Sequence, residues 1–516
     1  MRKEIILRLS PQEAFDKNSY KKIVEKIIKI SSSRISYVKV LNKSVDARNK
    51  DIKVNLKLLL VIDEQNPKFE KPEIKFQNVS NSPEIIIIGC GPAGLFAAIR
   101  LIELGFKPVI IERGKNVKER KKDIVLIQRN QSLNPDSNYC FGEGGAGAFS
   151  DGKLFTRSKK RGNVKRILEI FNFFGASEDI LIDAHPHIGS DKLPAIITNM
   201  RNAIINCGGE IHFNTKVVDF IIDSNTIKGI KTDKDINFYG NAVILATGHS
   251  ARDIYHIFSK NKLVIEAKPF AMGVRVEHPQ SIINSIQYHN SKQAKYLPSA
   301  TYKLVSQIKD RGVYSFCMCP GGFIVPASTG ENEIVVNGMS AFKRNSKFAN
   351  SGIVVEIRND DLHKYHKFNE LAGLEFQKQL EHLSFTNSGD GLIAPAQRLS
   401  DFVAGNFSSS LPLSSYTPGI VSSPMHKWLP EIIKKTLQKG FVDFNKKKKG
   451  FLTNEAIIVG VESRSSSPVR IPRDKTTMQH IEIKRLFPCG EGAGYAGGIV
   501  SSAIDGMNCA EKVCDI

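Results

Sequence analysis

The chain has no apolar run long enough to cross a membrane. Its longest runs, such as Leu58–Ile62 and Ile85–Ile88, hold only four or five residues, whereas a membrane-spanning helix needs about 20. The first residues, Met1–Arg8, alternate like a strand and have neither the apolar region of a signal peptide nor the composition of a transit peptide. We therefore expect no transmembrane segment and a cytoplasmic location.

Cysteine is too scarce for a disulfide framework, with eight residues among 516. No CxxC or other zinc-ligand spacing occurs, so we expect no metal site. The CxxxxC pair of disulfide reductases is also missing. Cys317 and Cys319 form a CxC, for which a redox pair is one interpretation and two buried small hydrophobic residues are the favoured one.

Acidic residues are outnumbered by basic ones, and the formal net charge is +21. A basic face of this kind can bind RNA, DNA or an acidic membrane. The lysines are scattered, however, and the one dense run, Lys446–Lys449, is not interleaved with aromatic residues. We therefore favour general lysine usage over a nucleic-acid site.

The sequence does contain a complete dinucleotide-binding pattern. An apolar strand runs into the glycine fingerprint Gly89–Gly94 and an apolar helix, and a second strand ends at Glu112. Gly89 allows the tight turn, Gly91 lets the backbone approach a pyrophosphate, and Gly94 lets helix and strand pack closely. The helix N-terminus offers free N–H groups to the phosphates. Glu112, about 20 residues after the fingerprint, is placed to accept hydrogen bonds from a ribose.

The hydrophobic pattern predicts an α/β protein with a discontinuous Rossmann-type domain. Residues 81–267 hold the first part of this domain and residues 451–516 its C-terminal part, with a mixed β-rich substrate or cap domain at 268–450. Residues 1–80 form a separate small α/β module, in which the order strand, helix, strand, strand resembles half of a ferredoxin-like unit. A polar, proline-bearing linker at 66–83 follows this module.

Periodicity gives the bounds of several elements. We expect strands at Ile5–Leu9, Ile35–Leu41, Ile52–Ile62, 210–222, 226–232, 236–239 and Ala242–Ala246, and helices at Tyr20–Ile30, 193–204 and 499–512. The strand Ala242–Ala246 must return to the parallel sheet beside the first strand. The long glycine-rich loop Phe141–Lys153 is typical of a functional segment.

These motifs resemble those of the glutathione-reductase-like FAD flavoproteins and, more closely, the FAD-dependent dehydrogenase family of bacteria and plastids. The resemblance covers the chain from about residue 80 to the C-terminus, and the N-terminal module also fits the family. The matching blocks are Gly142–Gly147 with Lys153–Leu154, Asp183–Gly189, Gly273–Pro279, Cys319–Gly322, Glu462–Arg470 and Gly490–Gly498. The resemblance implies a cofactor and a fold more than a reaction.

The implied cofactor is FAD. In that superfamily the late glycine-acid motif closes over the ribityl chain, and the following helix directs its N-terminus at the flavin ring, where reduced flavin carries negative charge. Backbone of Val217 is expected against the adenine. The cofactor-binding residues implied in this way are Gly89, Gly91, Pro92, Ala93, Gly94, Glu112, Arg113, Gly144, Gly145, Val217, Thr247, Gly248, Gly490, Glu491, Gly498 and Ile499.

A second glycine fingerprint followed by a strand and an acid is missing, so the chain resembles single-Rossmann flavoproteins without a resident NAD(P) domain. Electrons then come from transient NAD(P)H, from ferredoxin or from the substrate itself. Possible catalytic residues are few. Arg464 and Arg470 flank a run of serines and can bind a carboxylate or the flavin N1 region, although a surface loop is equally consistent.

Three further side chains are candidates for catalysis. Lys153 closes the glycine-rich loop and can support the flavin or a substrate anion. His185 and His187 form an HxH in a loop, where either can act as a general acid or base. Arg275 and Glu277 share one face of an expected strand, which suits a structural ion pair or a pocket wall equally.

The leading functional hypothesis is an FAD-dependent oxidoreductase, a dehydrogenase or a reductase, that acts on a small organic substrate with hydride passing through the flavin. One alternative is an RNA-directed flavoprotein in the manner of tRNA-modifying flavoenzymes, motivated by the charge of +21 and the separate N-terminal module. Another is a non-enzymatic flavin-dependent sensor or scaffold whose residues 1–80 dock a partner.

Overall fold

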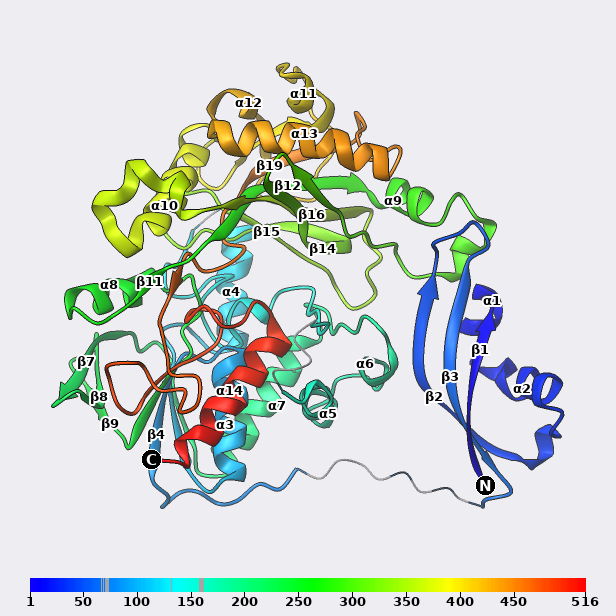
Figure 1. Cartoon of the computed structure of the whole chain (residues 1–516), viewed down its shortest axis with the longest axis horizontal. Coiled ribbons are helices and arrows are strands. Elements are labelled where there is room, and N and C mark those ends of the chain that lie inside the picture. The colour runs from blue at the N-terminus through cyan, green and yellow to red at the C-terminus, as the bar shows by residue number, and fades with distance from the viewer. Residues whose placement is uncertain (66, 68, 70–73, 131, 157–161) are drawn as a thin grey trace.

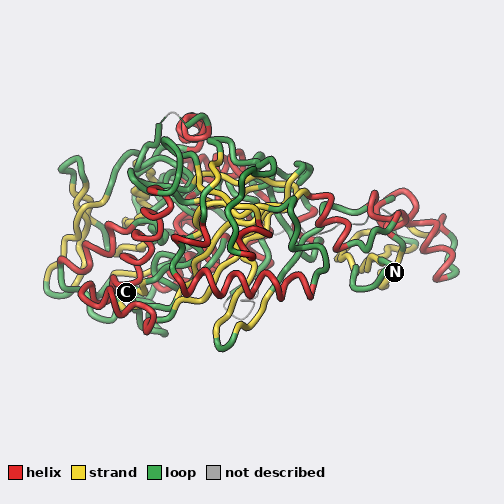
Figure 2. Tube along the Cα trace, turned by 90° about the horizontal axis from the view of Figure 1, so that it is seen from above, coloured by secondary structure: helices red, strands yellow, loops and turns green. Residues whose placement is uncertain are grey.

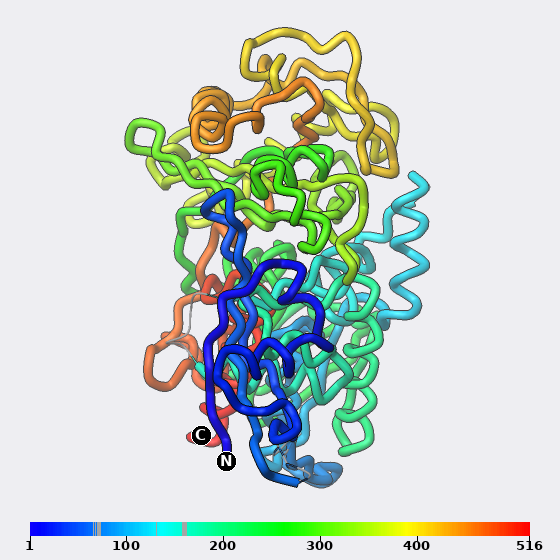
Figure 3. The backbone as a smooth tube through the Cα atoms, turned by 90° about the vertical axis from the view of Figure 1, so that its right-hand side faces the viewer, coloured from blue at the N-terminus to red at the C-terminus, as the bar shows by residue number. Residues whose placement is uncertain are grey.

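The protein is seen here as a computed structural model that describes residues 1–65, 67, 69, 74–130, 132–156 and 162–516. Its elements form a small N-terminal sheet, a parallel sheet with covering helices, and a large antiparallel sheet (Figure 1). Figure 2 shows the N-terminal sheet at one end of an elongated molecule. In Figure 3 the large antiparallel sheet and its helices lie above the parallel sheet.

The N-terminal sheet has the expected order of elements. Strands β1 (Arg2–Leu9), β3 (Lys53–Ile62) and β2 (Ile35–Asp46) pair antiparallel in that spatial order, and helix α2 (Tyr20–Ile28) joins β1 to β2. Alternate residues of β3 are buried, as a sheet with one solvated face requires. A short helix that the sequence did not predict, α1 (Pro11–Phe15), is capped by the Ser10 hydroxyl, which accepts from the Glu13 N–H.

The parallel sheet has the spatial order β21–β10–β4–β5–β6. Its strands are β4 (Glu84–Ile88), β5 (Lys107–Ile111), β6 (Glu210–His212), β10 (Ala242–Leu245) and β21 (Leu486–Pro488). The prediction that the strand near 242 returns beside the first strand is confirmed, since β10 pairs parallel with β4. The strand β21 brings the C-terminal part of the chain back to the same sheet.

Both faces of this sheet are covered, which explains the unbroken isoleucine run of β4. Ile85 and Ile87 face the side on which α3 (Pro92–Glu103), α7 (Leu193–Asn206) and α14 (Ile499–Val513) pack. Ile86 and Ile88 face the opposite side, where β7 (Val217–Asp223), β8 (Thr226–Thr232) and α8 (Arg252–Lys260) cover them.

The prediction of one strand over 210–222 is wrong. The segment contains β6 in the parallel sheet and β7 in a separate three-stranded meander with β8 and β9 (Asn237–Tyr239). Asn214 lies between β6 and β7 with a φ of 52°, in the left-handed region that asparagine tolerates. No glycine or proline lies between β6 and β7, so the sequence gave no strong sign of this turn.

The large antiparallel sheet has the order β13–β14–β16–β12–β19–β17–β18, in which only the edge strand β18 pairs parallel, and β15 pairs with β14. Helices cover one face of this sheet, and α12 and α13 among them lie near the top of Figure 1. The strands are β12 (Phe270–Pro279), β13 (Val305–Ile308), β14 (Arg311–Pro326), β15 (Val336–Met339), β16 (Phe348–Ile357), β17 (Ala394–Arg398), β18 (Ile420–Ser422) and β19 (Ile457–Glu462). The helices are α10 (Ala372–Thr386), α11 (Leu399–Ala404), α12 (Met425–Trp428) and α13 (Glu431–Lys447).

The remaining elements connect these regions. Helices are α4 (Val117–Gln128), α5 (Val164–Phe173), α6 (Asp179–Ile182) and α9 (Gln280–Gln287), and the short strands β11 (Glu266–Ala267) and β20 (Val469–Arg470) pair with each other. Of the helices within the described ranges, none has both the length and the apolarity needed to span a membrane.

Two helices pack on each other through a glycine. A Cβ on Gly506 of α14 would lie 2.1 Å from the carbonyl oxygen of Ala93 in α3. Because that contact is with backbone, no side chain can move aside. We expect Gly506→Ala to lower the free energy of unfolding by about 1–3 kcal/mol, since overpacking outweighs the gain of about 1 kcal/mol in helix propensity.

Urea denaturation measures this change. The matched control is Gly330→Ala, because an added Cβ there would come no closer than 3.9 Å to any described atom that its surroundings offer. The control is expected to stay within about 0.5 kcal/mol of wild type. Equal stability of the two variants would contradict the packing argument.

One buried histidine makes stability depend on pH. His278 of β12 is fully buried, its Nε2 donates to the Phe451 carbonyl at 2.8 Å, and its Nδ1 has no partner among the described residues. Burial lowers the pKa of His278 from 6.5 to about 4, and the Phe451 carbonyl only partly offsets this. The unfolded chain therefore takes up a proton near pH 6.5 that the folded chain refuses until about pH 4.

The contribution of neutral, buried His278 to the free energy of unfolding is thus complete above pH 6.5 and is lost as the pH falls toward 4. We expect the free energy of unfolding to drop by about 2 kcal/mol more between pH 7 and pH 5 in wild type than in His278→Gln. The exposed His366→Gln serves as control and should keep the wild-type pH dependence. An unchanged pH dependence in His278→Gln would refute the assignment.

Candidate functional site

A cavity of about 1140 Å³ lies between the carboxyl ends of the parallel strands and the large antiparallel sheet. It collects most of the residues expected to bind the cofactor or to act in catalysis. Those lining it are Gly89, Gly91, Pro92, Ala93, Glu112, Arg113, Gly145, Val217, Thr247, Gly248, Gly490, Glu491, Gly498, Ile499, Lys153, His185 and Arg464. Gly94, Gly144, Arg470 and His187 lie behind or beside this lining.

The glycine turn after β4 has the geometry that a phosphate cradle needs. Gly89 adopts a φ of 101°, and Gly91 is the N-cap of α3, where no described side chain caps the helix. A Cβ on Gly94 would lie 2.0 Å from the Gly89 carbonyl oxygen, so this glycine permits the close approach of strand and helix. The uncapped end of α3 therefore opens directly onto the cavity.

Glu112 is held by backbone. Its carboxylate accepts from the N–H groups of Cys90 at 2.8 Å, Gly114 at 2.9 Å and Gly142 at 3.1 Å. The side chain is 5% exposed and still lines the cavity. Glu112 thus connects the glycine turn to the loop at 142, in addition to offering an acceptor to a ligand.

An arginine that sequence reasoning missed holds the glycine-rich loop. Arg120 of α4 is fully buried and donates to the carbonyl groups of Asn138 at 2.7 Å, Glu143 at 2.8 Å and Gly145 at 2.9 Å. Burial lowers its pKa to about 10, although Glu112 acts in the opposite direction. In sequence Arg120 lies in a lysine-rich helix and resembles any exposed cation.

The late glycine-acid motif is also fixed from behind. The Gly490 N–H donates to Asp505 of α14 at 2.7 Å, and Arg473 forms an ion pair with the same carboxylate at 2.6 Å. The helix α14 begins at Gly498, and among the described side chains none caps it. A second helix N-terminus therefore opens onto the cavity.

Glu491 has a partner that the sequence did not indicate. The Nδ1 of His249 lies 3.4 Å from the Glu491 carboxylate, and its Nε2 donates to the Arg464 carbonyl at 3.0 Å. His249 lines the cavity next to Thr247 and Gly248. The sequence offered one indication of this role, because His249 directly follows Thr247 and Gly248, which were expected to bind the cofactor after the strand β10.

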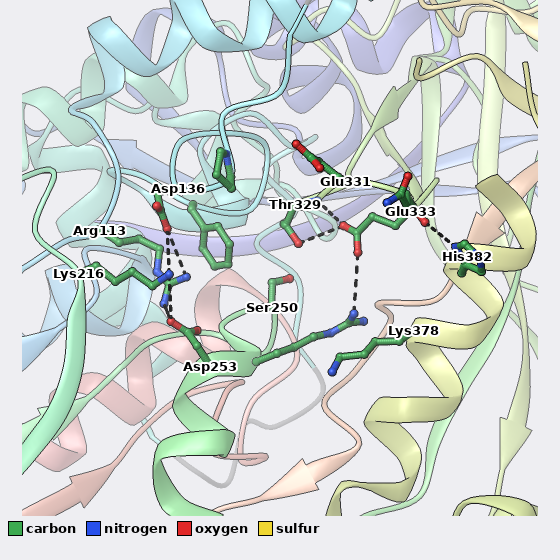
Figure 4. Close-up of a pocket in the computed structure, with 14 residues that line it drawn as sticks. Arg113, Asp136, Lys216, Ser250, Asp253, Thr329, Glu331, Glu333, Lys378 and His382 are labelled. Carbon is green, nitrogen blue, oxygen red and sulfur yellow. Dashed lines mark hydrogen bonds and ion pairs between the residues drawn. The ribbon is translucent and has the colours of Figure 1, made fainter. Parts of the chain in front are cut away.

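Arg113 lies where the cavity meets a smaller pocket (Figure 4). Its guanidinium forms an ion pair with Asp253 and lies 3.7 Å from Asp136, and it stacks 4.4 Å above the centre of the Phe141 ring. Lys216 reaches the same two carboxylates at 3.6 and 3.7 Å. The charge of Arg113 is therefore already paired within the protein.

The same holds for Arg464. It is 8% exposed and forms ion pairs with Glu333 at 2.8 Å and Glu381 at 3.1 Å. Glu381 also binds Arg252 at 2.7 Å, and Arg252 lies 4.0 Å from Glu333. Burial alone would raise the pKa of Glu381, but Arg252 and Arg464 lower it far below its usual range. Arg464 lines the cavity as part of this network, with its guanidinium bound to carboxylates of the chain itself.

Of the other candidates for catalysis, Lys153 and His187 lie opposite each other in an isolated β-bridge, and Lys153 and His185 line the same cavity. Arg470 of β20 lies with its guanidinium 5.7 Å from the centre of the Tyr495 ring. The Nε2 of His187 donates to the Phe342 carbonyl at 2.9 Å, and burial lowers the pKa of His187. His185 is exposed to the cavity, with its ring 4.7 Å from that of Phe155. Lys153 reaches the two cysteines of β14.

Arg275 and Glu277 do not pair with each other. Arg275 is fully buried and pairs with Glu462 at 2.7 Å. Glu277 accepts from the Ser414 hydroxyl at 2.8 Å and from the Ser415 N–H at 2.9 Å. Of the two interpretations of this strand, a structural ion pair describes Arg275, but with a partner on the neighbouring strand β19.

One group of side chains in the described ranges has the composition of a metal site. Cys489, Asp505 and Cys509 offer ligand atoms within 4.8 Å of one another. The Asp505 carboxylate is engaged by Arg473 and by the Gly490 N–H. Asp505 therefore has protein partners that account for its position without a metal ion.

Comparison with known proteins defines the class. Residues 269–465 match a family model described as "FAD-dependent protein, C-terminal domain-like", and residues 1–60 match a domain of unknown function, DUF8436. The chain is 37% identical to an uncharacterized protein of Clostridium beijerinckii over 519 residues, which covers 97% of this chain and 96% of that protein. The chain therefore belongs to the same family as that Clostridium protein.

Other similarities are weaker. The tRNA uridine 5-carboxymethylaminomethyl modification enzyme MnmG of Alkaliphilus metalliredigens is 26% identical over 190 residues, which covers 34% of this chain and 26% of that enzyme. Solved structures include CtdE in complex with FAD, with a TM-score of 0.31, 11% identity and 84% of each chain covered. A geranylgeranyl bacteriochlorophyll reductase-like protein from Thermoplasma acidophilum has a TM-score of 0.35 at 12% identity, with 84% of this chain and 78% of that one covered. These scores are too low to establish a shared fold.

Proposed function

We propose that this protein is an FAD-dependent oxidoreductase of the dehydrogenase or reductase type, acting on a small organic substrate. One observation carries the proposal. Two helices, α3 and α14, start without a described side-chain cap at the wall of the same large cavity. A helix N-terminus presents free N–H groups and a positive dipole end, and so attracts anions. The end of α3 suits a pyrophosphate, and that of α14 suits a reduced flavin ring.

The residues present fit FAD. Gly91 contributes no side chain, and the nearest described atom to an added Cβ there is the Gly145 Cα, 3.8 Å away, so the space in front of it is open. Glu112 lies at the end of β5 with its carboxylate on the cavity wall, where a ribose hydroxyl can donate to it. A volume of about 1140 Å³ exceeds the usual range of small-molecule sites, up to about 1000 Å³, as a dinucleotide with a substrate requires.

We assign the FAD-binding role to a discontinuous Rossmann-type domain of residues 81–267 and the C-terminal part of the chain, with the block from 268 facing the substrate. The pairing of β21 with β10 supports the discontinuity. The strand β19 pairs with β12 and so belongs to the large sheet. The C-terminal part of the nucleotide domain therefore begins after Glu462 rather than at residue 451. Residues 1–80 form the separate N-terminal module.

Bound FAD would supply the two-electron chemistry, and the chain supplies position and field. The N-terminus of α14 stabilises negative charge on a reduced ring. Asp505 fixes Gly490, and His249 orients Glu491 at the expected position of the ribityl chain. His185 is exposed and lines the cavity, where its imidazole can move a proton at the substrate.

The Gly91→Ala substitution tests the cradle. The new methyl group fits the chain but occupies the space where the backbone would approach a pyrophosphate. We expect FAD affinity, measured by fluorescence titration of the apoprotein, to fall about 10–100-fold, the equivalent of 1.4 kcal/mol per factor of ten. The unfolding midpoint should not change, and Gly330→Ala should bind FAD as wild type does. Undiminished binding by Gly91→Ala would remove the assignment.

The reaction class is tested by anaerobic titration of the FAD-loaded protein with NADH and NADPH in turn. Bleaching of the flavin absorbance by either one supports a nicotinamide-driven reductase, and bleaching by an organic donor instead supports a dehydrogenase. A protein that stays colourless after FAD reconstitution overturns the proposal. Binding of RNA at low salt, where phosphate contacts are strongest, would favour the RNA-directed alternative.

A further inference from the structure

A pair of cysteines lies on the cavity wall opposite the glycine turn. Cys317 and Cys319 belong to the long strand β14, and Cys317 lines the cavity while Cys319 is fully buried. The pairing of β14 with β16 is irregular on both sides of Cys319, and Cys317 has a φ of 46°, a left-handed conformation that a cysteine rarely adopts. Irregularities of this kind redirect side chains and are common next to active sites.

Two cations hold this pair. The Nζ of Lys153 lies 3.8 Å from the Sγ of Cys317 and 3.7 Å from that of Cys319. From the buried side, Arg275 donates to the Cys317 carbonyl at 2.9 Å and approaches the Cys319 Sγ to 3.6 Å. A cysteine that served only as a small hydrophobic residue would need no lysine beside it.

The surrounding charges leave room for one thiolate. The ion pairs around the two cysteines contain three cations, Lys153, Arg275 and Arg344, and two carboxylates, Asp151 and Glu462. Arg344 and Lys153 share Asp151, and Arg275 binds Glu462. Three positive charges thus face two negative ones, and a single thiolate would neutralise the cluster.

The pKa values follow this arrangement. The hydrogen bond with Cys319 is the largest cause that holds the pKa of Cys317 well below that of an ordinary thiol; burial opposes it, and Lys153 and Arg275 add to it. The same hydrogen bond, together with burial, raises the pKa of Cys319. One thiolate and one thiol in contact are the reactants from which a disulfide forms.

The loop 142–153 connects this pair to the expected flavin position. At one end, a Cβ on Gly147 would lie 3.2 Å from Ile499 at the start of α14. At the other end, Lys153 contacts both sulfur atoms. Cys317 and the first turn of α14 also line one continuous cavity.

We propose that Cys317 and Cys319 are a dithiol–disulfide redox pair within the cavity, and that the pair exchanges two electrons with FAD bound there. In the oxidising direction the Cys317 thiolate and the Cys319 thiol form one S–S bond. Two electrons and the Cys319 proton pass to oxidised FAD, which becomes the singly charged reduced flavin, so atoms and charge balance. The second half of this inference rests on the proposed function, and the first half does not.

Alkylation of the full chain tests the thiolate. The reduced protein, with and without FAD, is treated with iodoacetamide between pH 5.5 and 9, and each cysteine is followed by peptide mass spectrometry. We expect Cys317 to react at a nearly constant rate down to pH 6, at least tenfold faster there than Cys514. Cys514 is the internal control because it is exposed and its pKa is raised by burial and by Asp515. A pH profile for Cys317 that matches that of Cys514 would overturn the thiolate.

The disulfide is tested in the apoprotein by equilibration with mixtures of reduced and oxidised glutathione. We expect the peptide that carries both cysteines to lose two hydrogen atoms in wild type and in Cys514→Ser, but not in Cys317→Ser or Cys319→Ser. Lys153→Met should retain the fold and move the alkylation profile of Cys317 to higher pH. Mixed disulfides alone, with no internal bond at any ratio, would overturn the redox pair.

Electron exchange is tested by adding dithiothreitol anaerobically to the FAD-loaded protein. Flavin bleaching is expected in wild type and should slow at least tenfold in Cys317→Ser and Cys319→Ser. A disulfide without bleaching overturns the exchange with FAD. Failure to bind FAD at all is a failure of the proposed function, and the alkylation and glutathione results then decide the dithiol by themselves.

Discussion

Close backbone contact at the glycine turn after β4 is the constraint on which the candidate site depends. Glycines occupy the points at which the turn, the loop at 142–147 and the helix α14 approach one another: Gly91 meets Gly145 through backbone, and Gly147 lies against the Ile499 side chain. Two buried side chains then bind backbone groups at these contacts. Glu112 accepts from N–H groups, and Arg120 donates to carbonyl groups. The cavity wall is therefore built largely from backbone and stays open to a ligand with its own phosphates.

A second feature is the internal pairing of charge around the cavity. The guanidinium groups of Arg113, Arg464 and Arg275 are all bound to carboxylates of the chain. Removing one partner from a buried pair typically costs about 3–5 kcal/mol, so these arginines act first as structural ties between segments. The net charge of the chain consequently says little about the charge that a substrate meets.

The sequence allowed much of the nucleotide region to be predicted, because its signals are local. The isoleucine strand, the fingerprint and the distance to Glu112 lie within one short segment, and the return of β10 followed from its apolar run. The split between β6 and β7 was missed because a single left-handed asparagine makes it. The roles of Arg120, His249 and Asp505 were also missed, since each depends on a partner far away along the chain or on burial that a polar sequence does not reveal.

The pairing of β21 with β10 and of α14 with α3 has a consequence for biosynthesis. More than 400 residues separate Gly94 from Gly506, and at about 5–20 residues per second the ribosome takes about 20–80 s to make them. During that interval the parts of α3 and β10 that α14 and β21 cover in the finished protein stay exposed, which is the condition that recruits chaperones. The N-terminal module, whose strands pair within the first 62 residues, can fold as soon as it emerges.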